Sequence, residues 1–122
     1  MIDKNQQALL ELLKASLFGI EPSFPEEVDW GAVLKEAQDQ TVAALVASAV
    51  PPQEAAKWQI PVAKNKMQFL QILDEQTKLF QLFNDAGIPM AIIKGSAAAM
   101  YYPAPLNRTM GDIDFVVPLE CV

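Results

Sequence analysis

Two aspartates near the end of the sequence have the spacing that metal chemistry requires. Asp112 and Asp114 are separated by one residue, so on a β-strand their carboxylates project from the same face. Adjacent carboxylates repel each other, and a divalent cation is the usual reason for keeping both ionised. Hard oxygen atoms suit Mg²⁺, which takes one or two protein carboxylates and also binds water and substrate phosphates. We therefore expect Asp112 and Asp114 to hold Mg²⁺.

An upstream turn, Lys94-Gly95-Ser96, offers a place for those phosphates. Gly95 allows close backbone approach, and Ser96 suits the N-cap of a short helix over residues 97–102. A helix N-terminus favours an anion because its N–H groups are free and its dipole is positive there. Lys94 and Arg108 are the only cationic side chains in the last quarter of the chain. These four residues form the expected phosphate-binding set.

A purely structural explanation exists for each of these residues. Gly95-Ser96 could be an ordinary turn between a strand and a helix. Asp112 and Asp114 could lie on a solvent-facing strand, or they could form a salt bridge with Arg108. On a buried strand, two carboxylates would be costly without a partner. The metal hypothesis and the salt-bridge hypothesis both stay open on these residues alone.

The order of these motifs resembles a known family. Lys94-Gly95, Tyr102-Pro103 and the run from Arg108 to Asp114 (RTMGDID) are similar to the uncharacterised nucleotidyltransferase family of the DNA polymerase beta-like superfamily. In that family a strand ending in Lys-Gly leads through a Tyr-Pro loop to Arg-x-x-Gly-Asp-x-Asp. The likeness is tight over the last third of the chain and loose over the helical region before it.

The resemblance implies a reaction: Mg²⁺-dependent transfer of a nucleoside monophosphate from an NTP to an unknown hydroxyl acceptor. It implies that Asp112 and Asp114 are catalytic and bind the metal. It also implies that Lys94, Gly95, Ser96 and Arg108 bind the nucleotide. The alternative hypothesis is a non-catalytic nucleotide-binding module, or a helical interaction module whose palm-like end is a scaffold.

The family's palm also needs a third carboxylate on a later strand. The sequence ends at residue 122, directly after the expected Asp112 strand. We therefore expect the chain to be an N-terminal portion of a longer protein and to be inactive by itself. A palm cut at this point would leave a strand edge exposed, and such an edge readily recruits another chain. We accordingly expect self-association through that edge.

The preceding sequence indicates how these residues are positioned. Apolar residues recur at helical spacing through residues 1–86, whereas short β-like runs at 88–93 and 113–117 indicate largely buried strands. Asp3 and Asp29 are expected N-caps, and Pro61 is expected to introduce a long helix over residues 62–85. We predict a mainly helical α+β fold, with a helical region at 1–86 and the first β-α-β part of the palm at 87–122.

Composition narrows the partners. The chain has 122 residues and a net charge of −6, which argues against the clustered basic surface that nucleic acid needs. It has no histidine, so a Ser-His-Asp triad and a His-ligated zinc site are excluded. Its single cysteine and the absence of a signal-peptide pattern or a long apolar run predict a cytoplasmic protein without a membrane span.

Overall fold

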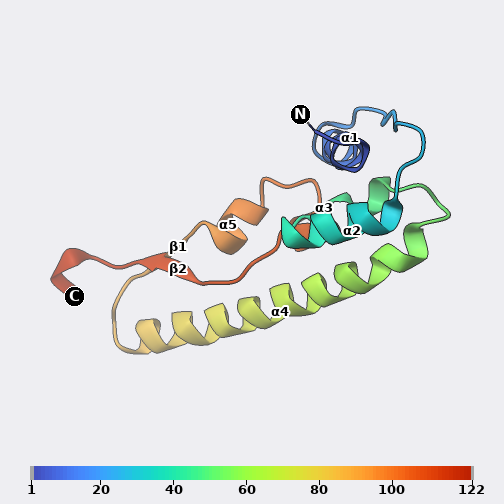
Figure 1. Ribbon diagram of the computed structural model, residues 1–122. Coiled ribbons are helices and arrows are strands. Elements are labelled where there is room, and N and C mark those ends of the chain that lie inside the picture. Colours follow the sequence, from blue (N-terminus) through green and yellow to red (C-terminus); the bar gives the residue numbers. More distant parts are fainter. Residues whose placement is uncertain (1, 122) are drawn as a thin grey trace. The chain divides into compact units, whose positions relative to one another are not determined.

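The computed structural model describes residues 2–121 and has a mainly helical α+β fold, as predicted. In chain order the elements are α1 (Lys4–Phe18), α2 (Trp30–Asp39), α3 (Ala43–Val46), η1 (Ala47–Ala49), α4 (Ala55–Asp85), β1 (Ala91–Ile93), α5 (Gly95–Ala99), η2 (Pro105–Asn107), β2 (Asp114–Val116) and η3 (Leu119–Cys121) (Figure 1). No helix in this described range is long and apolar enough to cross a membrane.

The chain divides into two compact units between Asn65 and Lys66. The predicted division at residues 86 and 87 falls at the end of α4, whereas contacts group the second half of that helix with the strands.

In the first unit, capping residues mark where the helices begin and end. The Asp3 carboxylate accepts a 2.8 Å hydrogen bond from the Gln6 backbone N–H, and the Gln6 side chain accepts one from the Asp3 N–H at 3.0 Å. This capping box fixes the start of α1. Gly19 ends α1 in a left-handed conformation at φ 67°. Asp29 caps α2 through a 3.2 Å bond from Ala32 N–H, as predicted.

The core of this unit forms where α1, α2 and α3 pack together. Trp58, from the first turns of α4, is fully buried there. The other buried residues of this core are all apolar: Ala8, Leu9, Leu12, Val33, Ala37, Ala43, Val46, Ala47 and Val50. The Leu-rich face of α1 is therefore core packing in part only, because Leu10 stays 48% exposed and Leu17 39% exposed.

Helix α4 starts earlier than predicted. Pro61 lies inside it rather than at its start. A tight turn precedes the helix, in which the N–H of Ala55 bonds the Pro52 carbonyl at 3.3 Å and that of Lys57 bonds Glu54 at 3.1 Å. This turn begins the helix, so Pro61 falls in its second turn and removes one backbone hydrogen bond. The predicted end is confirmed, because α4 ends at Asp85 and Gly87, two residues later, adopts φ 71°.

The second unit carries the two strands. They pair antiparallel, with Ala91 opposite Val116, Ile92 opposite Phe115 and Ile93 opposite Asp114. Both are shorter than predicted, and the prediction that they are largely buried is wrong. Phe115 contacts Phe83 of α4 with ring centroids 5.5 Å apart. Alternation turns Ile93 and Val116 to the opposite face, where they stay 41% and 49% exposed.

Candidate functional site

The strand register brings the Lys94-Gly95-Ser96 turn beside the aspartates. Ile93 and Asp114 form the last pair of the ladder, so we expect Gly95 and Asp112, which lie two residues beyond that pair, to be close together. The glycine geometry agrees, because a Cβ placed on Gly95 would lie 3.9 Å from the Asp112 carbonyl oxygen. Residues that are far apart in the sequence therefore meet at one end of the strand pair.

The two aspartates lie at the start of β2. Asp114 is its first residue and is half-buried, whereas Asp112 precedes the strand and is exposed. The prediction that the strand opens at Asp112 is therefore wrong by two residues. The alternation of side chains along a strand therefore fixes the side of Asp114 but not that of Asp112, which precedes the strand.

The turn itself has an unusual backbone. Lys94 adopts φ 57° and ψ −149°, a region that side-chain-bearing residues rarely occupy, and Gly95 follows at φ 46°. The Lys94 carbonyl accepts hydrogen bonds from the N–H groups of Ala97 at 2.9 Å and Ala98 at 3.1 Å. The first N–H groups of a helix have no partner within it, so those of Gly95 and Ser96 lie outside the helical hydrogen bonds.

This geometry corrects the predicted role of Ser96. The N-cap is Lys94, without a side-chain hydrogen bond, and Ser96 is the second residue of α5. The helix covers Gly95–Ala99 rather than residues 97–102. At five residues it has a small dipole, so anion binding here would depend on individual donors rather than on a long helix.

The Ser96 hydroxyl donates a 2.8 Å hydrogen bond to the side-chain oxygen of Gln76 in α4. Gln76 is only 5% exposed, and its buried Nε2 has no hydrogen-bond partner. A second α4 glutamine, Gln68, donates from Nε2 to the Met110 carbonyl oxygen at 2.7 Å. Helix α4 thus holds both the turn and the segment that leads to Asp112.

Sequence reasoning missed both glutamines. Gln68 and Gln76 lie eight residues apart, which places them on one side of a helix, with Ile72 between them. This side also carries Phe69, which packs with Ala99 and Met110 beneath the site. The signal in the sequence was the spacing, because Gln68 and Gln76 each lie four residues from Ile72, an apolar residue on the inward side of α4.

Arg108 is half-buried and lies over the Tyr102 ring, with its guanidinium carbon 6.0 Å from the ring centroid. This distance is at the limit of a cation–π interaction. Tyr102 therefore packs against the predicted phosphate-binding arginine.

The carboxylates fit a particular kind of metal site. Within residues 2–121 no group of three or more histidine, cysteine, aspartate and glutamate side chains could hold a metal ion. Asp112 and Asp114 provide two hard oxygen ligands. Mg²⁺ commonly binds one or two carboxylates and takes its other ligands from water and substrate phosphates. The residues present are thus suited to an ion that arrives with a nucleotide.

Comparison with known families decides the assignment. A family model described as "Uncharacterised nucleotidyltransferase" matches residues 26–122. The chain belongs to the uncharacterised nucleotidyltransferase family. The resemblance inferred from RTMGDID and the Lys-Gly turn is confirmed, and the chain is a nucleotidyltransferase-like protein. The match begins ahead of α2, so the family segment includes helices of the first unit. No curated protein and no solved structure matches the chain.

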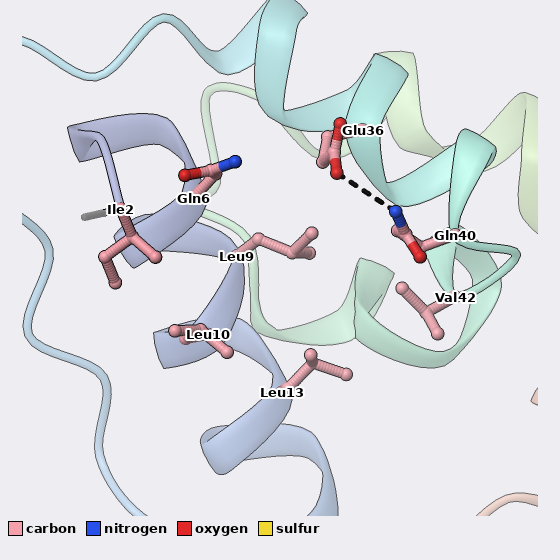
Figure 2. Close-up of a pocket in the computed structure, with 8 residues that line it drawn as sticks. All are labelled: Ile2, Gln6, Leu9, Leu10, Leu13, Glu36, Gln40 and Val42. Atoms are coloured by element: carbon pink, nitrogen blue, oxygen red, sulfur yellow. Dashed lines mark hydrogen bonds between the residues drawn. The ribbon is translucent and has the colours of Figure 1, made fainter.

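The family member has a separate hollow of about 360 Å³ in its first unit (Figure 2). There Gln40 donates a 3.2 Å hydrogen bond to the Glu36 carboxylate. The hollow is lined by Ile2, Gln6, Leu9, Leu10, Leu13, Glu36, Gln40 and Val42. This lining is mostly apolar, and its one charged group is an anion that would repel phosphate. The hollow therefore does not offer a nucleotide-phosphate site.

Proposed function

We propose that this nucleotidyltransferase family member binds an NTP with Mg²⁺ and serves the transfer of a nucleoside monophosphate to a hydroxyl acceptor. One observation carries the proposal: the Gly95 turn lies against the Asp112 backbone, just beyond the end of the β1–β2 ladder. Phosphate-binding groups and metal-binding carboxylates must be neighbours for this chemistry. The family assignment supports the reaction class.

In the proposal, Asp112 and Asp114 hold Mg²⁺. When bound, the ion would neutralise phosphate charge and polarise a phosphoryl oxygen. The backbone N–H groups of Gly95 and Ser96 bind the β- and γ-phosphates, and Lys94 and Arg108 offset their negative charge. The acceptor oxygen forms a bond to the α-phosphorus, the bond to the β-phosphate oxygen breaks, pyrophosphate leaves, and the hydroxyl proton passes to solvent.

We further propose that this chain binds nucleotide without turning it over. The described residues offer two carboxylates at the site and no third acidic group beside them. A third carboxylate normally completes such a site in the polymerase beta-like enzymes that the sequence resembles. This observation favours the second candidate function, a nucleotide-binding module, for the chain as it stands.

We also propose partners and a location for the protein. The net charge of −6 argues against nucleic acid as the acceptor. We propose a cytoplasmic location, where NTP and Mg²⁺ are both available. Within the described chain, β1 and β2 pair only with each other, so each has an unpaired outer edge. Such edges recruit further strands, and we propose that a second copy of the chain pairs there.

A binding and turnover experiment tests the function. The chain is titrated with each NTP by calorimetry, with Mg²⁺ and then with excess EDTA. In parallel, α-³²P-labelled NTP is followed for pyrophosphate release or label transfer. We expect Mg²⁺-dependent binding without turnover. Binding that is equal in EDTA would contradict the metal role of the aspartates, and absence of binding to every NTP would reject the function.

A further inference from the structure

The Gln76–Ser96 pair contains a hydrogen-bonding imbalance. Gln76 is 5% exposed, and its side-chain oxygen accepts the Ser96 hydroxyl at 2.8 Å. Its Nε2 carries two donor hydrogens and has no partner, although the atom is buried. Buried donors without partners are rare in folded proteins because each one loses its bonds to water. This orphaned amide reaches the first turn of α5, where the nucleotide phosphates are proposed to bind.

The present arrangement also occupies the serine proton. A hydroxyl has one proton to donate, and Ser96 gives it to Gln76. A phosphate oxygen can only accept hydrogen bonds, so Ser96 has no donor for it in this arrangement. Its backbone N–H does not depend on this choice.

Rotation of the glutamine amide reverses the pair. The terminal torsion of glutamine is broad and roughly two-fold, so its oxygen and nitrogen can exchange places within the same volume. Nε2 would then donate to Ser96 Oγ, and the serine proton would become available. In that orientation the oxygen has no partner and one Nε2 hydrogen stays unpaired, so each orientation leaves two hydrogen-bonding positions of the amide unsatisfied.

We propose that Gln76 is a positioning residue for Ser96, and that rotation of its amide releases the serine proton to a nucleotide phosphate oxygen. This inference rests on the proposed nucleotide site. An incoming anion favours the rotated state because that state alone lets the Ser96 hydroxyl donate to it. Gln76 acts through Ser96 and does not touch the substrate.

Substitutions separate this role from simple packing. Gln76→Glu keeps the side-chain length and can still accept from Ser96, but an ionised carboxylate has no hydrogen to donate back. It therefore locks the serine proton. Gln76→Leu removes both the amide oxygen and the amide nitrogen, so residue 76 no longer restrains the Ser96 hydroxyl. Gln71→Glu adds the same charge at an exposed position of α4 and is the matched control.

The test uses the whole 122-residue chain and Mg²⁺-tripolyphosphate as the probe. Side-chain amide signals are recorded by ¹H–¹⁵N NMR, and those of Gln76 are assigned by their loss in Gln76→Leu. We expect one Gln76 Nε2 proton to move downfield on saturation, as it gains the Ser96 oxygen. In Ser96→Ala the same signal should not move, although the remaining donors still bind the probe.

Affinity gives the second readout. Gln76→Glu should weaken tripolyphosphate binding by roughly tenfold or more, and Gln76→Leu by less. Gln71→Glu should change it less than twofold. Saturation without movement of the Gln76 signal, or wild-type affinity in Gln76→Glu, would overturn this inference alone. If the wild-type chain binds neither tripolyphosphate nor any NTP, the proposed function falls and the inference falls with it. Should Gln76→Glu fail to fold, the wild-type and Ser96→Ala spectra still decide.

Discussion

The side-chain amide of Gln68 holds the Met110 carbonyl oxygen at 2.7 Å, two residues before Asp112. This bond joins α4 to the segment that enters the aspartate pair. Because Met110 is 2% exposed, its carbonyl would have no ready access to water if the amide were removed.

We predict that Gln68→Met lowers the free energy of unfolding by about 1–3 kcal/mol, the cost of leaving a buried acceptor unpaired. Urea denaturation followed by circular dichroism measures the loss. Gln71→Met is the control, since it makes the same change at an exposed position of α4. Equal stability of the two variants would contradict the importance of the Gln68 bond.

The aspartate pair provides the next prediction. Asp112→Asn or Asp114→Asn should weaken Mg²⁺-dependent NTP binding by roughly tenfold or more, because a neutral amide replaces a charged ligand. In any longer protein that carries the segment, nucleotidyl transfer should be abolished. Folding should survive, since removing one of two repelling carboxylates relieves repulsion.

Calorimetry and a melting curve measure both effects, with Asp85→Asn at the exposed end of α4 as the control. Near-wild-type binding would show that these aspartates are not the metal ligands. Loss of folding would support the salt-bridge explanation of Asp112, Asp114 and Arg108.

Substitutions of Lys94 can separate stability from nucleotide binding, because the strain lies in its backbone and the positive charge in its side chain. At φ 57° and ψ −149°, a glycine is more comfortable than a lysine. Lys94→Gly should therefore raise stability by up to about 1 kcal/mol, while it lowers NTP affinity through loss of the cation. Lys94→Met should lower affinity without the gain in stability. If Lys94→Gly destabilised the chain, the strain at this turn would be refuted.

A local pH effect is expected at Glu11, in the middle of α1. The Lys14 ammonium, 2.6 Å away, and the Ser23 backbone N–H, 3.2 Å away, hold the pKa of Glu11 below its usual value. A lowered pKa in the folded state means that the ionised carboxylate stabilises the fold. That contribution is present above the unfolded pKa and is lost as pH falls through the folded one.

Wild type should therefore melt at a higher temperature than Glu11→Gln at neutral pH, and the difference should shrink as the pH falls below about 4. A gap that widens on acidification would contradict the sign of this linkage.

The unpaired strand edges predict association. Wild-type chain should show a rising mass with concentration in light scattering, because β1 and β2 can accept a further strand. Val116→Lys should suppress the rise by placing a charge on the 49% exposed valine of β2. Ile60→Lys adds the same charge on α4 and should leave the association unchanged. A monomer at all concentrations would refute edge pairing.

The sequence predicted those features that local residues decide. Asp3, Gly19 and Gly87 set helix ends through their own side chains or backbone conformations, so α1 and the end of α4 were predictable. Pro61 was misplaced because the turn before it, rather than the proline, starts the helix.

Burial and long-range contacts were not available from the sequence. The apolar run Phe115-Val116-Val117 predicted a covered strand, but cover depends on how many layers pack against it. The Gln76–Ser96 and Gln68–Met110 bonds cross 20 and 42 residues of chain. Amides of this kind are ordinary surface residues in most helices, so only the folded structure identifies their partners.

The pairing of Ile93 with Asp114 has a consequence for the segment between the strands. The strand pairing, rather than the number of residues between Ser96 and Asp112, brings Gly95 close to Asp112. Tyr101 is 90% exposed at the outer part of this excursion. Residues inserted or deleted there would lengthen or shorten a surface loop and leave the turn and the aspartates in register. The chemistry of the site is thereby uncoupled from the length of the peptide that connects its two halves.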